Sequence, residues 1–424
     1  MRIVLIGMRG SGKSTIGKIL ARKLNWKYIE TDRLIEKKES QKISRLVEKY
    51  GWERFRELET EVIQSLGNTE RSVIASGGGV ILNEENMKIL KNNSITIWLQ
   101  ANILTLIERC GMDKNRPFLT DGKTIEDDLK TTLIQREVLY RRYADFSVVN
   151  EYKTEEQVAC EILEHKICCI IGHPVAHSLS PIMHNTAYKA LGLNYIFLPF
   201  DVTDLKSAVT SIKNLGIVGC AVTVPHKIKV MKYLDKIDET AKKIGAVNTI
   251  INLKGTLTGL NTDWSGALDA LKEKTELAGK NVALIGAGGA ARAIAYGLKQ
   301  EAAYVTVFNR NKGHGKELVK DLHLDSYIPL KESTKLDGFD IVINAISVGL
   351  ESRQSPLTKK SLNQKQVVFD IVYFPRMTRF LKAAKEVGCS IITGDRMLLH
   401  CVKRQFELFT GKRIPVEILE DAIC

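Results

Sequence analysis

Residues 3–15, Ile-Val-Leu-Ile-Gly-Met-Arg-Gly-Ser-Gly-Lys-Ser-Thr, decide the fold of the first part of the chain. The four apolar residues that open this stretch predict a short buried strand of a parallel sheet. Apolar side chains then recur at helical spacing, at Ile16, Ile19, Leu20 and Leu24. The segment between strand and helix has the spacing G-x-x-x-x-G-K-S, which indicates a loop that binds nucleotide phosphates. A chance glycine-rich loop is the alternative, and the flanking strand and helix argue against it.

The phosphate-binding loop supplies specific candidate contacts to ATP. Its backbone amides and the helix N-terminus present partial positive charge to phosphates. We expect Lys13 to reach the β- and γ-phosphates and to act in catalysis, and the Ser14 hydroxyl to bind Mg²⁺. The other expected ATP contacts in this loop are Gly10, Ser11, Gly12 and Thr15.

A candidate acceptor site follows the first helix. Residues 26–32, Trp-Lys-Tyr-Ile-Glu-Thr-Asp, predict a short strand that ends in two carboxylates on one face, Glu30 and Asp32. In open α/β sheets, substrates bind outside the carboxyl ends of the strands. Asp32 is therefore a candidate catalytic residue that orients or deprotonates a hydroxyl for attack on the γ-phosphate.

Three further features of this region suit ligand binding. The consecutive glycines 77–79 follow an apolar run, and glycine lets a backbone approach a ligand closely. Arg56 and Arg136 lie in helical stretches, and Arg116 lies in a polar stretch, residues 111–125, that suits a closing lid. A single arginine is more often a solvated residue on a helix face, so these assignments depend on the motifs occurring together.

In order and spacing, these motifs resemble shikimate kinase over residues 1–160. The resemblance implies a site in which bidentate arginines bind the shikimate carboxylate, while an aspartate and a backbone segment contact the rest of the ring. The members of that site are Asp32, Arg56, Gly78 and Arg136. The resemblance also implies that Arg116 covers ATP. Glu30 stands near the metal where the family usually has an aspartate. The alternative function is phosphorylation of a nucleotide, as in adenylate kinase, and the three consecutive glycines disfavour it.

A second fold begins near residue 166. Residues 150–165 are polar and predict a last helix of the first domain, and residues 167–171, Ile-Cys-Cys-Ile-Ile, predict a new buried strand. We therefore expect two domains, 1–165 and 166–424, joined by a very short linker.

Residues 281–291, Asn-Val-Ala-Leu-Ile-Gly-Ala-Gly-Gly-Ala-Ala, predict a strand, a glycine-rich turn and a helix. The spacing G-x-G-x-x-A in this setting indicates dinucleotide binding. A second strand, 304–308, is followed by Asn309 and Arg310. NAD enzymes place an acid there for the ribose 2′-hydroxyl, whereas an arginine attracts a 2′-phosphate, so NADP is favoured. The candidate contacts in the turn are Gly286, Ala287, Gly288, Gly289 and Ala290.

The segments around this turn contain residues suited to the reduction of a ketone. Ser178 and Ser180 offer two hydroxyls to one carboxylate, Lys227 follows a predicted strand, and Asp263 follows another apolar run. Ketone reduction needs a proton donor near the oxygen, which a lysine coupled to an aspartate supplies. Taken singly, Lys227 is equally well a surface lysine and Asp263 a helix N-cap.

The combination resembles shikimate dehydrogenase in order and spacing over residues 166–424. The resemblance implies that Lys227 is the catalytic acid/base and that Asp263 is its catalytic partner. The shikimate site that it implies consists of Ser178, Ser180, Thr223, Lys227, Asn248, Asp263 and Tyr373. It also implies that Ile371 and Gly394 lie at the nicotinamide.

Four positions depart from that family's pattern. Ala221 replaces an asparagine, Ile346 a threonine, and His314 a basic residue near the 2′-phosphate, while Cys401 replaces a substrate-binding glutamine. Loss of one amide contact costs about 1–3 kcal/mol, or roughly tenfold to a hundredfold in binding. Two alternatives therefore stay open: a dehydrogenase of altered preference, toward quinate, and a catalytically weakened binding module.

Composition excludes several other classes of function. Residues 166–424 hold 35 basic and 24 acidic side chains, against 27 and 25 in residues 1–165. No run of like charge or of alternating aromatic and basic residues is present, so anionic small molecules explain the net charge of +13 better than nucleic acid does. No apolar run is long enough to span a bilayer. The eight cysteines lack C-x-x-C spacing, which favours a reducing cytoplasm.

Together these patterns predict an α/β protein with a parallel sheet of the P-loop kinase type, followed by a two-lobed dehydrogenase with a Rossmann-type NADP domain. We expect a substrate lobe of residues 166–263 plus 395–424 and an NADP lobe of residues 264–394. The predicted function is a bifunctional enzyme of aromatic amino-acid (chorismate) biosynthesis. It reduces 3-dehydroshikimate to shikimate with NADPH and phosphorylates the 3-hydroxyl of shikimate with ATP and Mg²⁺. Its expected partners are these small molecules, without nucleic acid or membrane.

Overall fold

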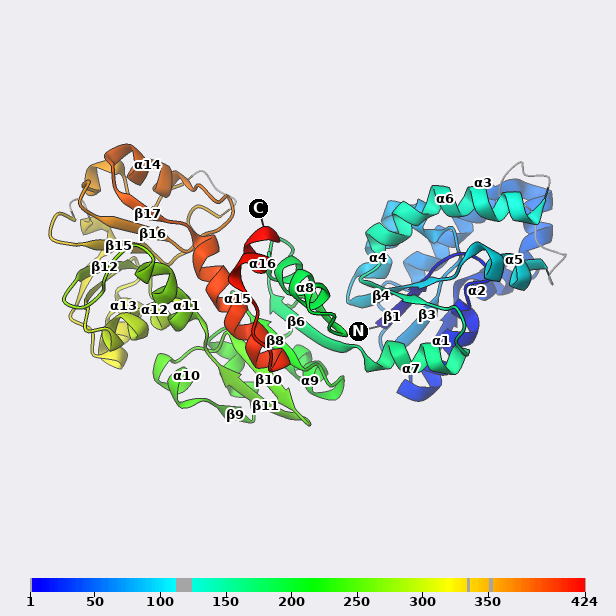
Figure 1. Ribbon diagram of the computed structural model, residues 1–424, viewed down its shortest axis with the longest axis horizontal. Helices are drawn as coiled ribbons and strands as arrows, with labels where there is room; N and C mark the ends of the chain where they lie inside the picture. The colour runs from blue at the N-terminus through cyan, green and yellow to red at the C-terminus, as the bar shows by residue number, and fades with distance from the viewer. Residues whose placement is uncertain (1, 112–123, 334–335, 351–353, 424) are drawn as a thin grey trace. The chain divides into compact units, whose positions relative to one another are not determined.

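The computed structural model describes residues 2–111, 124–333, 336–350 and 354–423. The chain separates into two compact units, Met1–His165 and Lys166–Cys424 (Figure 1). Arg116 and residues 112–123 of the predicted lid lie outside the described residues.

The first unit is built on a five-stranded sheet in the order β2-β3-β1-β4-β5. Every neighbouring pair of strands is parallel. The strands are β1 (Arg2–Ile6), β2 (Lys27–Glu30), β3 (Ser72–Ala75), β4 (Ser94–Gln100) and β5 (Phe146–Val149). All residues of β1 and β3 are buried, as expected for central strands covered on both faces.

Helices follow the strands and cover the sheet of the first unit. They are α1 (Lys13–Leu24), α2 (Thr31–Glu39), α3 (Ile43–Ser65), α4 (Glu84–Lys91), α5 (Ile103–Gly111), α6 (Ile125–Tyr143) and α7 (Glu155–Glu164), with the 3-10 helix η1 (Val80–Leu82). Gly12 precedes α1 with φ 90°, a left-handed conformation that glycine adopts without strain. This turn aims the N-terminus of α1 at the glycine-rich loop.

The second unit begins with a six-stranded mixed sheet in the order β7-β6-β8-β10-β11-β9. Its strands are β6 (Lys166–Gly172), β7 (Tyr195–Asp201), β8 (Gly219–Val222), β9 (Lys236–Ile237), β10 (Thr249–Leu253) and β11 (Thr256–Leu260). Its helices are α8 (Ser180–Ala190), α9 (Leu205–Asn214), η2 (Lys229–Tyr233), α10 (Glu239–Ile244), α15 (Gly394–Thr410) and α16 (Val416–Asp421). Successive residues of β6 point to opposite faces: Cys168 packs in a core with residues of α8 and α15, and Cys169 in a core with residues of α9.

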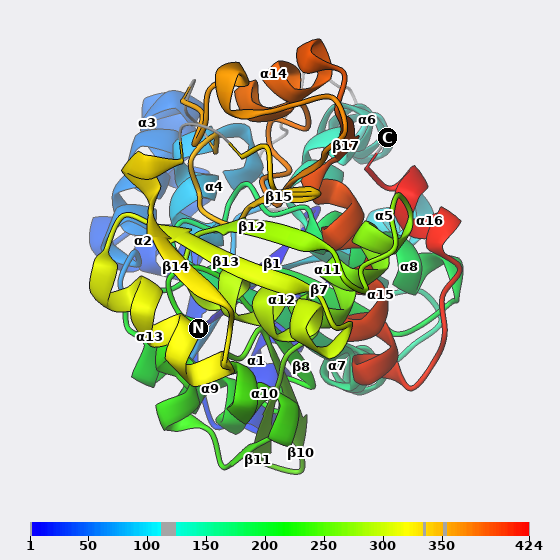
Figure 2. The same cartoon turned by 90° about the vertical axis from the view of Figure 1, so that its left-hand side faces the viewer.

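A second sheet of the same unit is entirely parallel, in the order β14-β13-β12-β15-β16-β17. Its strands are β12 (Asn281–Ile285), β13 (Tyr304–Asn309), β14 (Ser326–Pro329), β15 (Ile341–Asn344), β16 (Val367–Asp370) and β17 (Ser390–Ile392). Its helices are α11 (Asp263–Lys272), α12 (Gly289–Gln300), α13 (Lys312–Leu322), α14 (Arg379–Val387), η3 (Leu330–Glu332) and η4 (Lys359–Ser361). Figure 2 shows α12 and α13 on one side of this sheet and α14 on the other. The predicted α/β fold class, with its P-loop sheet and Rossmann-type sheet, is confirmed.

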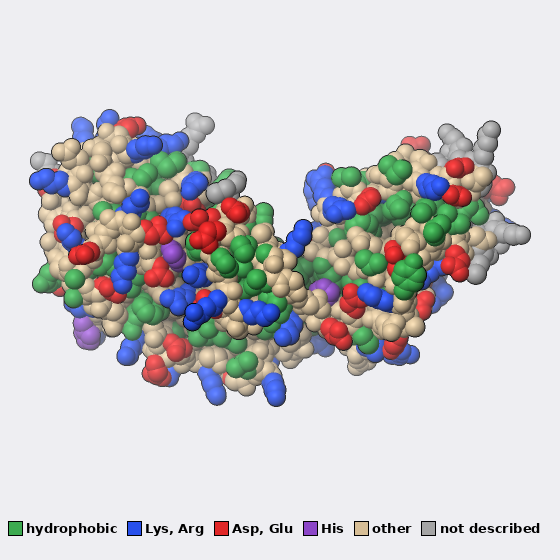
Figure 3. Space-filling model, in the orientation of Figure 1, with side chains coloured by type: hydrophobic (Ala, Val, Ile, Leu, Met, Phe, Trp, Pro, Cys, Tyr) green, Lys and Arg blue, Asp and Glu red, His purple; other side chains and the backbone are tan. Residues whose placement is uncertain are grey.

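The surface carries charges of both signs. Basic and acidic side chains are interspersed over the visible face of each unit in Figure 3. Among the described residues, no helix combines the length and apolarity that crossing a membrane requires. The seven cysteines in the described part of the chain are free thiols.

Candidate active sites

Lys13 lies at the start of α1 with its ammonium group directed at the glycine-rich loop. Its Nζ donates to the backbone oxygens of Gly7 at 2.9 Å and of Met8 at 2.8 Å, and the side chain is buried. Asn150 at the end of β5 donates its side-chain amide to the backbone oxygen of Ser11 at 2.9 Å. The loop is therefore held in one shape, with its cation already in position.

Ser14, the next residue of α1, contacts a carboxylate of the neighbouring strand. Its Oγ donates to Glu30 Oε1 at 2.6 Å, and the Tyr28 hydroxyl donates to Glu30 Oε2 at 3.1 Å. A hydroxyl and a carboxylate beside nucleotide phosphates are oxygen ligands of the kind that Mg²⁺ prefers. Within the described residues there is no group of three or more His, Cys, Asp or Glu side chains placed to hold a metal. A magnesium ion here would therefore depend on phosphate oxygens as well.

The prediction that Glu30 and Asp32 share one face of a strand is wrong. β2 ends at Glu30, and Asp32 lies in the first turn of α2. The strand period of two gives way to the helical period of 3.6 between them, so the two carboxylates diverge. Glu30 contacts Ser14, whereas Asp32 lies beside the glycine triplet: a Cβ placed on Gly77 would be 2.8 Å from Asp32 Oδ1.

A fully buried carboxylate, Glu59 of α3, lies beside Asp32. A Cβ on Gly77 would be 2.7 Å from Glu59 Oε1, so only glycine leaves room for both acids. Arg56 donates to Glu59 Oε2 at 2.6 Å. Burial raises the pKa of the Glu59 carboxyl, and the Arg56 guanidinium partly opposes that shift. Glu59 Oε1 accepts no hydrogen bond from the described residues, so it is an acceptor suited to a hydroxylated ligand.

Arg136 on α6 reaches the same region. Its side chain is buried, which lowers the pKa of the guanidinium, and its close neighbours include Tyr140 and Arg56. The Tyr140 hydroxyl donates to the backbone oxygen of Gly78. The fold thus brings together Asp32, Arg56, Gly78 and Arg136, which come from four separate segments of the sequence.

In the second unit, Lys227 and Asp263 form an ion pair. The Nζ of Lys227 lies 2.6 Å from Asp263 Oδ2, and both side chains are largely buried. Lys227 follows β8, whereas Asp263 is the first residue of α11. The Asn248 side-chain amide donates to the other oxygen, Asp263 Oδ1, at 2.7 Å. The lysine is therefore held by a carboxylate that is itself held in place.

This ion pair lines a cavity of about 430 Å³ between the two sheets of the second unit. The predicted substrate residues that line it are Ser178, Ser180, Thr223, Lys227, Asn248, Asp263 and Tyr373. The predicted nucleotide contacts that line it are Gly288, Gly289, Ala290, Ile371 and Gly394. The polar side chains predicted to bind substrate and the glycine-rich turn thus face one space, as a hydride transfer between two ligands requires.

Two glycines permit the close approaches on the nucleotide side of the cavity. A Cβ on Gly289 would lie 3.0 Å from the Cβ of Lys227, and one on Gly394 would lie 2.5 Å from the backbone oxygen of Ile371. The remaining predicted nucleotide contacts do not line this cavity. Gly286 and Ala287 lie at the end of β12, and Asn309 and Arg310 lie at the end of β13, where Arg310 is exposed.

Three family models match consecutive parts of the chain. The shikimate kinase model matches residues 9–166, the shikimate dehydrogenase substrate binding domain matches residues 170–250, and the shikimate/quinate 5-dehydrogenase model matches residues 269–379. The chain carries a shikimate kinase domain followed by the domains of a shikimate dehydrogenase.

Proteins similar to the second unit are shikimate dehydrogenases. NADP⁺-dependent shikimate dehydrogenase of Nitrosopumilus maritimus is 41% identical over 269 residues, which are 61% of this chain and 98% of that protein. The Pyrococcus furiosus enzyme of the same name is 45% identical over 258 residues, 60% of this chain and 94% of that protein. The Thermus thermophilus shikimate 5-dehydrogenase structure with NADP(H) and shikimate is 35% identical, with a TM-score of 0.57 over 61% of this chain and 98% of that one. The chain belongs to the shikimate dehydrogenase family in its second unit.

Three of the four departures from the dehydrogenase pattern lie in the reaction cavity. Ala221, Ile346 and Cys401 all line it, whereas His314 is exposed on α13. The Cys401 thiol is buried, 3.7 Å from Asp263 Oδ1, and burial raises its pKa well above the ordinary value. Cys401 is therefore a weak, neutral hydrogen-bond donor.

Two functional candidates were not predicted from the sequence, Glu59 in the kinase unit and Gln405 in the dehydrogenase unit. Glu59 follows Arg56 at a spacing of three on α3, and Gln405 follows Cys401 at a spacing of four on α15. Both spacings place two side chains on one helix face, which was the available signal. Gln405 is buried and lines the dehydrogenase cavity.

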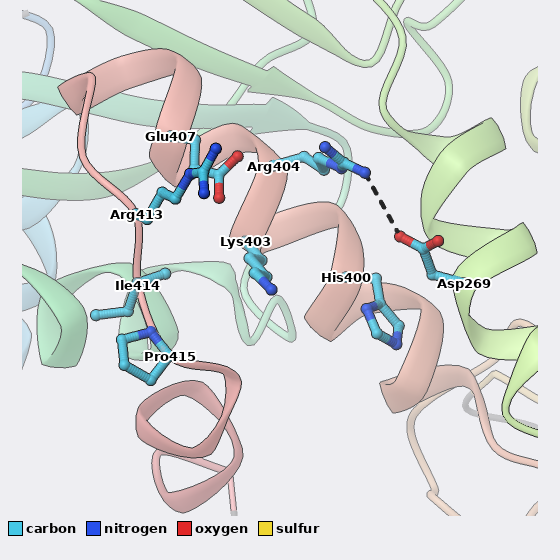
Figure 4. A pocket seen from close by; sticks show the side chains of 8 residues that line it. All are labelled: Asp269, His400, Lys403, Arg404, Glu407, Arg413, Ile414 and Pro415. Carbon is cyan, nitrogen blue, oxygen red and sulfur yellow. Dashed lines mark ion pairs between the residues drawn. The ribbon is translucent and has the colours of Figure 1, made fainter.

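A second cavity, of about 540 Å³, lies on another face of α15. It is lined by Asp269, His400, Lys403, Arg404, Glu407, Arg413, Ile414 and Pro415 (Figure 4). Arg404 points toward Asp269 and pairs with it at 3.9 Å, while His400 contacts Glu273 at 2.8 Å. Because its charges are mixed and largely exposed, we assign it no part in catalysis.

Proposed function

We propose that the chain catalyses two successive steps of aromatic amino-acid (chorismate) biosynthesis. The dehydrogenase unit reduces 3-dehydroshikimate to shikimate with NADPH, and the kinase unit transfers the γ-phosphoryl group of ATP to the 3-hydroxyl of shikimate. The observation that carries this proposal is the Lys227–Asp263 ion pair at 2.6 Å. It lines one cavity together with serine, threonine and tyrosine hydroxyls of the protein and with the glycine-rich turn after β12. We also propose residues 1–165 as the kinase domain, 166–263 with 395–424 as the substrate lobe, and 264–394 as the NADP lobe.

In the dehydrogenase unit, Lys227 donates a proton to the ketone oxygen during reduction. Asp263 keeps the ammonium oriented, and Asn248 holds Asp263 from its other oxygen. Hydroxyl groups then bind the carboxylate and the remaining polar groups of the substrate; these residues are Ser178, Ser180, Thr223 and Tyr373. When bound, NADPH supplies the hydride, and the close approach allowed by Gly394 and Ile371 suits the nicotinamide ring.

In the kinase unit, the partly buried Arg56 and the buried Arg136 bind the shikimate carboxylate, and Asp32 orients the hydroxyl that attacks phosphorus. Gly78 contributes backbone contact with the ring. Lys13 offsets the charge that develops on the transferred phosphoryl group. Glu59 adds an acceptor beside Asp32 for a second hydroxyl of the ring.

The contacts of Ser14 and Glu30 fit a magnesium ion on the nucleotide phosphates. Ser14 would be a ligand, and Glu30 would hold ion-bound water, since the two side chains already lie 2.6 Å apart. When bound, Mg²⁺ neutralises phosphate charge during transfer. Arg116, expected to cover ATP, lies outside the described residues.

Turnover of 3-dehydroshikimate with NADPH, ATP and Mg²⁺ together tests the proposed function. We expect NADPH to be consumed and ADP to be released, and the final product to be a phosphorylated shikimate. ADP release should stop when Mg²⁺ is chelated, while NADPH consumption continues. A chain that consumes NADPH without releasing ADP, or releases ADP from shikimate without consuming NADPH, would refute one half of the proposal and retain the other.

A second candidate for the dehydrogenase unit is a preference for quinate, or binding without turnover. Cys401 favours it, because a thiol gives a substrate hydroxyl a weaker contact than an amide does. A quinate dehydrogenase of Corynebacterium glutamicum with NAD shares 28% identity and a TM-score of 0.56 over 61% of this chain and 98% of that one. Oxidation rates with shikimate and with quinate, measured side by side, distinguish a preference for shikimate from a preference for quinate and from binding without turnover.

Arg136→Lys should raise the KM for shikimate in phosphorylation by about tenfold to a hundredfold, because lysine lacks the planar pair of donors that a carboxylate accepts. The KM for ATP should stay near that of the parent. Arg142→Lys, at an exposed position later on α6, is the matched control and should change neither constant. Equal effects of the two variants on the shikimate KM would contradict the proposed role of Arg136.

Arg310→Glu should raise the KM for NADP⁺ by about tenfold to a hundredfold, because the new carboxylate repels the 2′-phosphate. The KM for NAD⁺ should change far less. Lys320→Glu, an identical charge reversal at the other end of α13, controls for the general field of the lobe. If Lys320→Glu and Arg310→Glu weaken NADP⁺ equally, Arg310 makes no specific contact with the 2′-phosphate.

A further inference from the structure

The side-chain amide of Gln405 is buried next to the catalytic ion pair. Gln405 is 4% exposed and lies on α15, one turn beyond Cys401 and facing the same cavity. Its Nε2 donates to Thr249 Oγ1 at 3.0 Å and to the backbone oxygen of Asn248 at 3.3 Å. The buried Gln405 amide therefore has specific hydrogen-bond partners, and its role is not limited to packing in the core.

The amide of Gln405 donates to the Thr249 hydroxyl and so leaves that hydroxyl to donate its hydrogen elsewhere. A hydroxyl has one hydrogen, and Thr249 Oγ1 accepts from Gln405, so the hydrogen is left for another acceptor. The nearer acceptor is Asn248 Oδ1, at 2.8 Å, while Thr262 Oγ1 lies at 3.4 Å. The backbone amide of Thr262 donates to the same Oδ1 at 2.7 Å. The Thr262 hydroxyl lies 3.3 Å from Oδ1 as a third donor, and these donors establish which end of the Asn248 side chain is oxygen.

The orientation of Asn248 in turn determines the contact that Asp263 receives. With Oδ1 occupied by donors, the Nδ2 of Asn248 faces Asp263 Oδ1 at 2.7 Å. A flipped amide would set its oxygen against that carboxylate and its NH₂ group against the Thr262 amide, and both contacts are repulsive. Asp263 is thereby left with Oδ2 for Lys227, at 2.6 Å. Hydrogen bonds therefore run without a break from α15 to the lysine.

We propose that Gln405 is a positioning residue of the dehydrogenase, acting through Thr249 and Asn248 on the Asp263–Lys227 pair. This inference rests on the proposed acid/base function of that pair. Cys401 does not substitute for Gln405, because its sulfur lies 3.5 Å from the backbone oxygen of Thr262 and 3.7 Å from Asp263 Oδ1, and a thiol is a weak donor. Instead, the amide of Gln405, one turn farther along α15, holds the catalytic residues in position through Thr249 and Asn248.

The test is a double-mutant cycle on the rate of shikimate oxidation by the full chain. Gln405→Met and Thr249→Val remove the amide and the hydroxyl with little change of volume. We expect each to lower kcat by about fivefold to tenfold, with the KM for NADP⁺ unchanged. The double variant should be no slower than the slower single variant, because both changes break one chain of hydrogen bonds. Thr249→Ser, which keeps the hydroxyl, should restore most of the rate.

Gln366→Met is the matched control. Gln366 is also buried in the same unit, and its amide donates to the backbone oxygens of Leu336 and Phe339, away from the ion pair. It should lower the unfolding temperature without changing kcat by more than about twofold. The inference would be overturned if the effects of Gln405→Met and Thr249→Val on kcat were additive. It would also be overturned if these substitutions lowered the unfolding temperature and left kcat unchanged. An unmodified chain that failed to oxidise shikimate would instead refute the proposed dehydrogenase function.

Discussion

Replacing Lys227 by alanine is expected to abolish shikimate oxidation while shikimate phosphorylation continues at the parent rate. Proton transfer by a positioned side chain contributes about 10²- to 10⁴-fold to a reaction, and Lys227 is the cation nearest Asp263 in the cavity. We expect kcat to fall by that factor, measured by the absorbance of reduced nicotinamide. The KM for NADP⁺ should change little, because Lys227 approaches the nucleotide turn through the apolar part of its side chain, Cβ and Cδ.

Lys229→Ala is the matched control for this substitution. Lys229 lies two residues farther along the chain, is exposed and begins η2. It should oxidise shikimate at the parent rate. If Lys227→Ala retained near-parent oxidation, the acid/base assignment would be wrong, and if it lost phosphorylation as well, the substitution would have acted on folding. The kinase unit of the same chain thus serves as an internal reference.

Lys13→Met should have the reciprocal effect, a loss of phosphorylation with unchanged shikimate oxidation. The ammonium of Lys13 is buried in the loop and bound to two backbone oxygens, so its charge is preorganised where phosphate would lie. Removing one preorganised donor at a site of developing charge costs about 10²- to 10³-fold in kcat. Release of ADP from ATP in the presence of shikimate measures this loss.

Lys18→Met controls for the loss of a charge from α1. Lys18 is an exposed residue of the same helix, and its ammonium lies 5.8 Å from the ring centroid of Tyr28. It should phosphorylate shikimate within about twofold of the parent, as surface substitutions usually do. Comparable losses of phosphorylation in the two variants would mean that the rate depends on the net charge of the helix and not on the position of Lys13.

The two units present different groups for the same carboxylated ring in the proposed function. The kinase unit offers two guanidinium groups, Arg56 and Arg136, whereas the dehydrogenase unit offers the hydroxyls of Ser178, Ser180 and Tyr373. A ring that binds beside the phosphates of ATP suffers repulsion between anions, which cations offset. A ring that binds beside a nicotinamide has no such neighbour, and neutral donors suffice. Raising the salt concentration should therefore weaken shikimate binding by the kinase more than by the dehydrogenase.

The sequence by itself predicted the features that depend on local backbone chemistry. The loop before α1 needs glycine at Gly12, where φ is 90°, and the turn after β12 needs it at Gly286, where φ is 121°. Such requirements leave a readable spacing, because only glycine adopts these conformations without strain. The continuous apolar runs likewise predicted the buried parallel strands of both units, since strands covered on two faces alternate little in polarity. Fold class and nucleotide loops follow from residues close together in the chain.

Only the tertiary structure decided which polar side chains meet. Asp32 was expected on a strand and lies on a helix, because α2 begins one residue before it. Glu59 and Gln405 resemble ordinary polar residues of helices α3 and α15, and they become candidates only once packing buries them beside Asp32 and Asn248. The spacing along each helix indicates only that two of its side chains share a face. Which residues from distant parts of the chain meet that face is set by how sheets and helices pack.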